Sequence, residues 1–274
     1  MRTQRIGKLD IEQDRLSKEL ERCNHFEYSA AYNDFLCGQW RSAMLWNRTG
    51  DPDESHISTY EGDVVKTKYA AQLPYLTSLV ERSFNLKHLR FARIAILTPR
   101  SVIIPHRDLL ELDAPMHRMH IPLITNPDCY SSEDNVVYQM RFSEAWFLDA
   151  ARMHSAASFS DLDRMHLILD FANVEDPKAL LNFSTNGATG IPAENIYRRA
   201  DLSAEERDTM LSLSRLINME NYKDIFAILI KNYFRRELGS ETVWDLMSAI
   251  STNCRNQEVQ RHTERQKEYF LLRR

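Results

Sequence analysis

The sequence is poor in features that mark several common classes of protein. Its four cysteines are scattered and form no CxxC pair, which indicates reduced thiols rather than a disulfide framework or a zinc site. No apolar run is long enough to cross a membrane, and no signal-peptide core follows the amino terminus. A net charge of -4 provides no broad cationic field for nucleic acid. We therefore expect a cytoplasmic protein that binds neither membranes nor nucleic acid.

The hydrophobic pattern predicts a β-rich core followed by helices. Hydrophobic residues make up 43% of the 274 residues, which is ordinary for a globular protein. Alternating or apolar runs predict strands over residues 89–97, 102–108, 118–125 and 164–171, and a hairpin over 136–148. Later the pattern becomes helical, with a capping box at Ser203 and Glu206, an apolar helix over 221–236, and Ser240 as the cap of another. We expect a β core with N-terminal helices over residues 1–185 and a C-terminal helical domain over 200–274.

A short motif on the second of these strands could bind a metal. His106 and Asp108 are two residues apart, so on an extended strand both side chains point to the same face. His154 follows a later hydrophobic strand, at whose end it would lie at the mouth of a barrel. Two histidines and one carboxylate, with open positions opposite, are the ligand set of non-haem Fe(II) oxygenases. An HxD pair by itself is weak evidence, and the interpretation depends on the residues around it.

Other residues on the predicted strands could bind an anionic ligand. Arg164 begins the strand after His154, and its planar guanidinium is suited to grip a carboxylate with two parallel hydrogen bonds. Arg118 and His120 share one face of another strand. Each has a plainer interpretation, the arginines as surface ion-pair partners and His120 and His166 as core histidines. The aromatic residues of the N-terminal part could equally be ordinary core: Tyr32, Trp40 and Trp46.

With these residues in view, the chain resembles the bacterial Fe(II)/2-oxoglutarate-dependent free-proline cis-hydroxylases of the cis-3 and cis-4 types. These belong to the wider aspartyl/asparaginyl β-hydroxylase-like group. The resemblance spans nearly the whole chain and is carried by residues 32–40, 91–94, 103–108, 118–120, 146–150, 154–156, 159–160 and 221–225.

The resemblance implies a double-stranded β-helix, or jelly-roll, core that binds Fe(II), 2-oxoglutarate and dioxygen. It implies that iron is held by His106, Asp108 and His154. It also implies that Arg164 anchors the distal carboxylate of 2-oxoglutarate and that His120 assists at the other end. The expected substrate is a free amino acid, most simply L-proline hydroxylated at C3 or C4 in cis, with release of succinate and carbon dioxide. The residues expected around it are Arg93 and Arg118 at its carboxylate, and Tyr32, Trp40 and Trp46 in the pocket.

Some residues depart from the family pattern and leave alternatives open. Many relatives have Gly where Ser143 stands, so the turn there is predicted to close without a positive φ. Trp46 agrees with the cis-3 type, whereas Cys37 and Gly38 agree with the cis-4 type. The alternatives are L-pipecolate or another amino acid as substrate, or a non-catalytic jelly-roll binding protein. A cupin isomerase is disfavoured because no glycine lies between Gly62 and Gly187. We expect a monomer or a homodimer.

Overall fold

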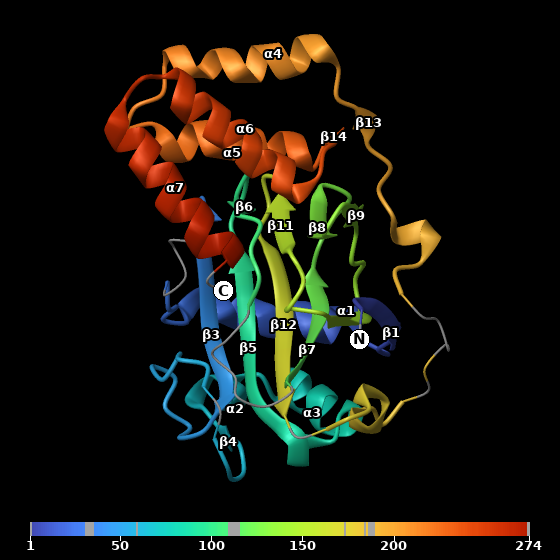
Figure 1. Ribbon diagram of the computed structural model, residues 1–274. Coiled ribbons are helices and arrows are strands. Elements are labelled where there is room, and N and C mark those ends of the chain that lie inside the picture. The colour runs from blue at the N-terminus through green and yellow to red at the C-terminus, as the bar shows by residue number, and fades with distance from the viewer. Residues whose placement is uncertain are drawn as a thin grey trace.

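Two antiparallel β-sheets lie face to face and form the centre of the protein (Figure 1). The computed structural model describes residues 2–30, 36–58, 60–108, 116–172, 174–183, 185 and 190–272. The larger sheet has the order β1 (Gln4–Lys8), β10 (Glu144–Leu148), β7 (Met116–Ile124), β12 (Arg164–Ala172), β5 (Leu89–Leu97), β3 (Trp40–Asn47) and β4 (Val65–Lys66). The smaller sheet has the order β2 (Leu36–Cys37), β6 (Val102–Ile103), β11 (His154–Ser158), β8 (Cys129–Glu133) and β9 (Val136–Tyr138).

From β5 onward the chain passes back and forth between the two sheets. Strands β5, β7, β10 and β12 belong to the larger sheet, and β6, β8, β9 and β11 belong to the smaller one. This alternation is the topology of a double-stranded β-helix, and it closes two four-stranded halves around a shared interior. The predicted fold class, a jelly-roll core with C-terminal helices, is confirmed.

The central strand β12 is buried along its whole length. Met165, Leu167 and Leu169 face a hydrophobic core on the outer side of the larger sheet. That core is completed by α1 (Gln13–Leu20), α2 (Lys68–Gln72) and α3 (Pro74–Ser83). Because side chains alternate along a strand, Arg164 and Asp170 face the other way, into the space between the sheets. The polar face of β12 is thus turned toward the interior of the jelly roll rather than toward solvent.

The C-terminal helices cover the smaller sheet and share a hydrophobic core with it (Figure 1). They are α4 (Ala204–Ser212), α5 (Tyr222–Tyr233), α6 (Ser240–Asn253) and α7 (Gln257–Leu272), and the short parallel pair β13 (Ala200–Asp201) and β14 (Arg236–Glu237) lies beside them. The core joins Val102 and Ala157 of the sheet to Phe226 and Trp244 of the helices. No helix among the described residues is long and apolar enough to span a membrane.

The capping box at the start of α4 is confirmed, since the side chains of Ser203 and Glu206 each accept a backbone N–H from the other residue. The cap predicted for α6 is wrong. Its N-cap residue is Gly239, and Ser240 is the first residue of the helix.

Three local predictions about the β core are also wrong. The strand expected over residues 102–108 ends at Ile103, and a single bridge pairs His106 with His154. The hairpin expected over residues 136–148 does not form, because β9 pairs with β8 in the smaller sheet while β10 pairs with β1 and β7 in the larger sheet. Ser143, in the turn between them, has a φ of 64°, so this turn uses the left-handed conformation that glycine adopts more readily.

Candidate metal centre and active site

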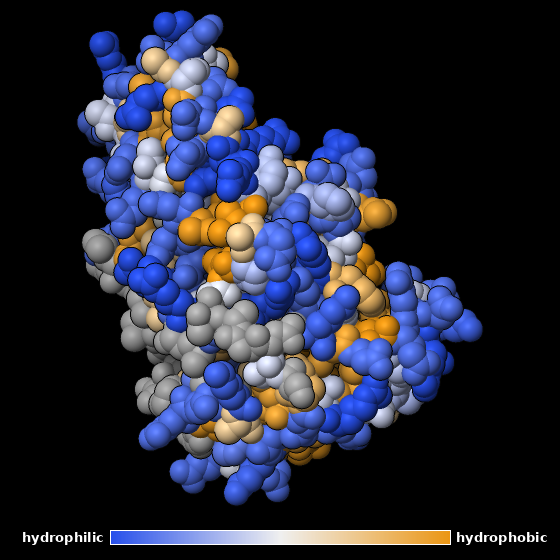
Figure 2. Space-filling view, turned by 90° about the vertical axis from the view of Figure 1, so that its right-hand side faces the viewer, coloured by the Kyte–Doolittle hydropathy of each residue, from blue (hydrophilic) through white to orange (hydrophobic). Residues whose placement is uncertain are grey.

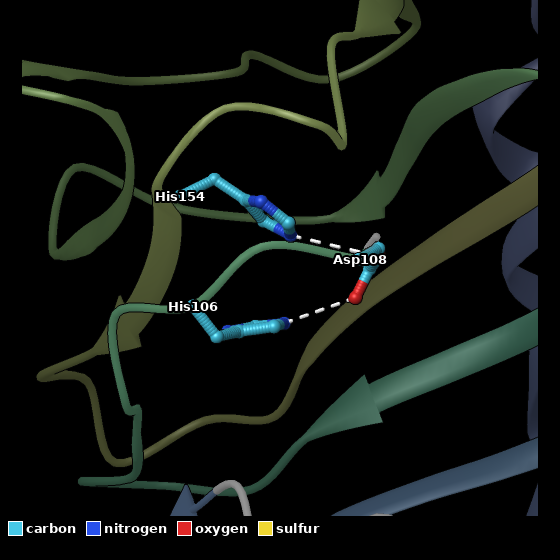
Figure 3. Close-up of side chains that lie close together, drawn as sticks. All are labelled: His106, Asp108 and His154. Atoms are coloured by element: carbon cyan, nitrogen blue, oxygen red, sulfur yellow. Dashed lines mark ion pairs between the residues drawn. The ribbon is translucent and has the colours of Figure 1, made fainter. Parts of the chain in front are cut away.

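Two histidines and one aspartate come together where the ends of neighbouring segments meet (Figure 3). The backbone N–H of His106 donates to His154 O at 3.0 Å, and the N–H of His154 donates back to His106 O at 2.8 Å. This bridge places the two imidazole rings side by side, with centroids 4.5 Å apart. Asp108 is fixed by its N–H, which donates to Ala150 O at 2.8 Å. One candidate ligand atom from each of the three side chains lies within 4.8 Å of the other two.

Backbone carbonyls orient both imidazole rings. Nδ1 of His106 lies 2.7 Å from Ile104 O, and Nδ1 of His154 lies 2.9 Å from Arg152 O. Because a carbonyl oxygen only accepts, each Nδ1 carries a hydrogen, which leaves Nε2 as the atom of each ring that can bind a metal. The Nε2 atoms face Asp108, at 3.2 Å from Oδ1 for His106 and 3.7 Å from Oδ2 for His154. Such outer partners are the usual means of orienting metal-binding histidines, so the three residues fit a divalent transition metal.

The protonation states of these groups also suit a cation. Burial, with a smaller contribution from His106, lowers the pKa of His154 to about 4, so the ring is neutral near pH 7. Burial alone would raise the pKa of Asp108, but Arg118 and the two histidines together hold it well below its usual range. At neutral pH the cluster therefore offers the neutral imidazole of His154 and the carboxylate of Asp108.

Two arginines and a second aspartate lie beside the histidine–aspartate cluster. Asp170 accepts hydrogen bonds from Arg118 Nε at 2.7 Å and from Arg93 Nη1 at 2.8 Å. Nη1 of Arg118 in turn donates to Asp108 Oδ2. The side chains of Arg93 and Asp170 are 5% and 1% exposed, so this ion pair is screened little by water. Of the two arginines predicted at the substrate carboxylate, Arg118 thus contacts the candidate ligand Asp108, and Arg93 is joined to Arg118 through Asp170.

Arg164 is buried and has no acidic partner within ion-pair distance in the described part of the chain. Its guanidinium Nη2 donates to the hydroxyl of Ser131 at 3.0 Å, and burial lowers its pKa. A buried cation without an anionic partner is energetically costly, and the described residues supply none, which suits a site that receives an anion. Arg164 lies close enough to the neighbouring His120 to lower the pKa of that ring.

His120 and His166 form a buried pair near Arg164. Their Nδ1 atoms lie 3.4 Å apart, and neither Nε2 has a hydrogen-bond partner among the described residues. Burial, with Arg118 next, holds the pKa of His120 well below its usual range, and burial and Arg164 do the same for His166. Both rings are therefore neutral, and the Nε2 of His120 remains available to a ligand.

The three aromatic residues predicted in the pocket do not form one group. Trp40 is half-buried and packs against the core shared with the C-terminal helices. Trp46 is buried in the outer core with Ala92, its partner across the sheet, so the structure does not bring it to the arginines. The reason is a bulge between Met44 and Trp46, which turns Trp46 to the opposite face from Met44 and Arg93. Tyr32 lies outside the described residues.

Three residues of this site were not predicted from the sequence. The strand pattern places Asp170 and His166 on the same face as Arg164 but gives them no role, and nothing in the pattern singles out Ser131. The sequence signal for Asp170 is a carboxylate within a mostly apolar strand, because a charge so placed is buried and requires a partner.

Comparison with known proteins places the chain in a family. The family model described as aspartyl/asparaginyl β-hydroxylase matches residues 4–173. The chain belongs to the aspartyl/asparaginyl β-hydroxylase family. A second model, described as the C-terminal part of L-proline 3-hydroxylase, matches residues 178–274 of this hydroxylase. The resemblance found in the sequence and the predicted enzyme class are confirmed.

Named relatives cover most of this hydroxylase. An L-proline cis-4-hydroxylase of Rhizobium meliloti is 33% identical over 91% of this chain and 89% of its own. An L-proline cis-3-hydroxylase of a Streptomyces species is 29% identical over 99% of this chain and 95% of its own. Among solved structures, a prolyl-4-hydroxylase of Pseudomonas putida covers 63% of this chain and 91% of its own, at 14% identity and a TM-score of 0.39.

Proposed function

We propose that this hydroxylase uses Fe(II), 2-oxoglutarate and dioxygen to hydroxylate free L-proline at C3 or C4 in cis, with release of succinate and carbon dioxide. The observation that carries the proposal is the cluster of His106, Asp108 and His154, with both imidazoles turned toward the carboxylate by backbone carbonyls. The substrate is taken from the relatives, which are named L-proline cis-4- and cis-3-hydroxylases.

The proposed work of the protein is to bind and orient. His106, Asp108 and His154 would hold the iron, which with 2-oxoglutarate supplies the oxidising chemistry when bound. Arg164 would grip the distal carboxylate of 2-oxoglutarate, supported by its buried position and by its lack of an acidic partner among the described residues. His120 would contact the same cosubstrate through Nε2, which has no partner within the described chain.

The amino acid would bind beside the metal. Arg93 and Arg118 are proposed to hold its carboxylate, because both are fixed by Asp170 and Arg118 also contacts Asp108. A clamp of this kind determines which C–H bond lies nearest the reacting centre. Trp40 is retained as a proposed pocket residue, and Trp46 is omitted because of its place in the outer core.

The test is a reaction with purified protein, Fe(II), ascorbate and 2-oxoglutarate. L-Proline should stimulate the formation of succinate, and NMR of the product should show a hydroxyl at C3 or C4. L-Pipecolate and a panel of other free amino acids test the alternative substrates. If no amino acid in the panel stimulates succinate formation, the proposal is wrong.

The alternative of a non-catalytic binding protein requires its own control. His106→Ala removes one candidate ligand of the metal. We expect this variant to lose turnover completely. A wild-type protein that binds L-proline without turnover, and a variant that binds it equally well, would favour the binding protein.

A further inference from the structure

We propose that Asp170, which is not one of the three candidate ligands, is a positioning residue for the metal centre and acts through Arg118. The proposal rests on the proposed function and adds a residue to it. Asp170 lies two residues before the end of β12 and is buried. It accepts from Nε of Arg118 at 2.7 Å, while Nη1 of the same guanidinium donates to Asp108. A continuous path of charged groups therefore runs from the larger sheet to the candidate ligand.

The geometry of the guanidinium explains how this path would orient the ligand. The group is planar and its donors have fixed directions, so fixing one edge fixes the others. Asp170 fixes the edge that carries Nε, with a further contact of 3.4 Å to Nη2. Nη1 is then directed at Oδ2 of Asp108, which leaves Oδ1 on the side of His106 Nε2, 3.2 Å away. Asp170 would thus determine which oxygen of Asp108 is presented to a metal.

The balance of charge around Asp170 supports the same role. Arg93, Arg118, Asp108 and Asp170 together carry two positive and two negative charges. Although burial raises the pKa of Asp170, the two arginines outweigh this effect and lower it, so the side chain is ionised near neutral pH. Loss of that one charge would leave a net positive group beside a divalent cation, in surroundings where screening by water is weak.

The experiment is a titration of the purified protein with Co(II) alone, without amino acid or 2-oxoglutarate. Asp170→Asn keeps the shape of the side chain and removes its charge. Because outer-shell partners typically affect metal affinity by about 10–100-fold, we expect the dissociation constant for Co(II) to rise by about that factor. The visible absorption of bound Co(II) should also change, since the orientation of Asp108 alters the ligand field.

The matched control is Asp163→Asn. Asp163 immediately precedes β12 and forms an ion pair with Arg41 at 3.0 Å, at a partly exposed position. This variant should bind Co(II) as the wild type does. It controls for the general effect of removing an aspartate charge from an ion pair.

A second variant keeps the proposal falsifiable if Asp170→Asn does not fold. Arg118→Lys keeps the positive charge but lacks the planar fork that bridges two carboxylates, so it should also weaken Co(II) binding. Unchanged Co(II) affinity and absorption in every folded variant, as judged by near-ultraviolet circular dichroism, would overturn the role of Asp170. A wild-type protein that binds no Co(II) would contradict the proposed function itself, so the two failures are distinguishable.

Discussion

Replacement of Arg164 by methionine should affect the stability of the protein and its binding of 2-oxoglutarate in different ways. Arg164 is 5% exposed, and among the described residues its guanidinium donates to the hydroxyl of Ser131 and has no acidic partner. Without cosubstrate, Arg164→Met exchanges this charge for an apolar side chain of similar length. We therefore expect the free energy of unfolding to stay equal or to rise by about 1–2 kcal/mol, as when other buried charges are replaced by apolar residues. For a chain of this size, each kcal/mol corresponds to about 2–4 °C in the melting temperature.

The same change should remove the binding of 2-oxoglutarate. Each hydrogen bond to a charged group contributes about 1.5–3 kcal/mol, so loss of a two-bond fork costs about 3 kcal/mol or more. That is a rise of at least about 100-fold in the dissociation constant. At a concentration of 100 times its own dissociation constant, 2-oxoglutarate should stabilise the wild type by about 2.7 kcal/mol. At the same concentration it should stabilise Arg164→Met by less than about 0.5 kcal/mol.

The assay is thermal unfolding with Mn(II) in place of iron, with and without 2-oxoglutarate. Arg100→Met is the matched control, because Arg100 is exposed and pairs with Asp161 on the surface. The control should respond to 2-oxoglutarate as the wild type does. Stabilisation of Arg164→Met by 2-oxoglutarate as strong as that of the wild type would refute the proposed role of Arg164. A loss of several kcal/mol without cosubstrate would also refute it, because Arg164 would then be a structural residue.

Three further predictions concern stability. Glu19 of α1 accepts the first backbone N–H groups of α3 at 2.6 and 2.9 Å. Glu19→Ala should therefore lower the free energy of unfolding by about 1–2 kcal/mol in urea denaturation, and an unchanged midpoint would contradict this role. Ser143→Gly removes the strain of a φ of 64° and should raise the free energy of unfolding by up to about 1 kcal/mol. A lower free energy of unfolding would show instead that the serine side chain stabilises the turn. The pKa values of His120 and His166 are well below 6.5 in the folded protein, so the unfolded chain binds more protons below that pH. The free energy of unfolding of the metal-free protein should therefore be highest above about pH 6.5 and should fall below that pH by about 1.4 kcal/mol per pH unit for each histidine. An unchanged free energy of unfolding between pH 6.5 and 5 in urea denaturation would contradict the low pKa values of the two histidines.

The sequence allowed several strands and the candidate metal ligands to be predicted. Strong alternation in β5 and β12 made those strands recognisable, since a two-residue period is typical of a strand with two different faces. His106 and Asp108 are near neighbours in the chain, so their common face could be inferred even though the strand proved shorter than predicted. His154 was identified because it follows a recognisable apolar strand.

Contacts that depend on pairing between distant strands were not predictable in the same way. Asp170 meets Arg118 and Arg93 only because β12 lies between β7 and β5, and the hydrophobic pattern of one sequence does not reveal that order. Trp46 was assigned to the pocket, but a one-residue bulge reversed its face. The expected hairpin before Leu148 failed for a related reason, because its two strands belong to different sheets.

The surface beside these sheets carries mixed polar and apolar residues, as Figure 2 shows for one face of the molecule. Scattered apolar side chains on a surface are normal for a folded protein. The residues that carry the chemistry proposed above are buried between the sheets instead, as the low exposure of His106, His154 and Arg164 shows. The function of these residues is therefore best tested by measuring reaction products rather than by chemical labelling of the surface.

The most direct test of the proposed reaction follows its oxygen atoms. The purified protein is supplied with Fe(II), 2-oxoglutarate and L-proline under isotopically labelled dioxygen, and the products are analysed by mass spectrometry. We expect hydroxyproline and succinate to form in equal amounts, each with one labelled oxygen atom. Succinate that forms at the same rate without any amino acid, or hydroxyproline without label, would contradict the proposed function.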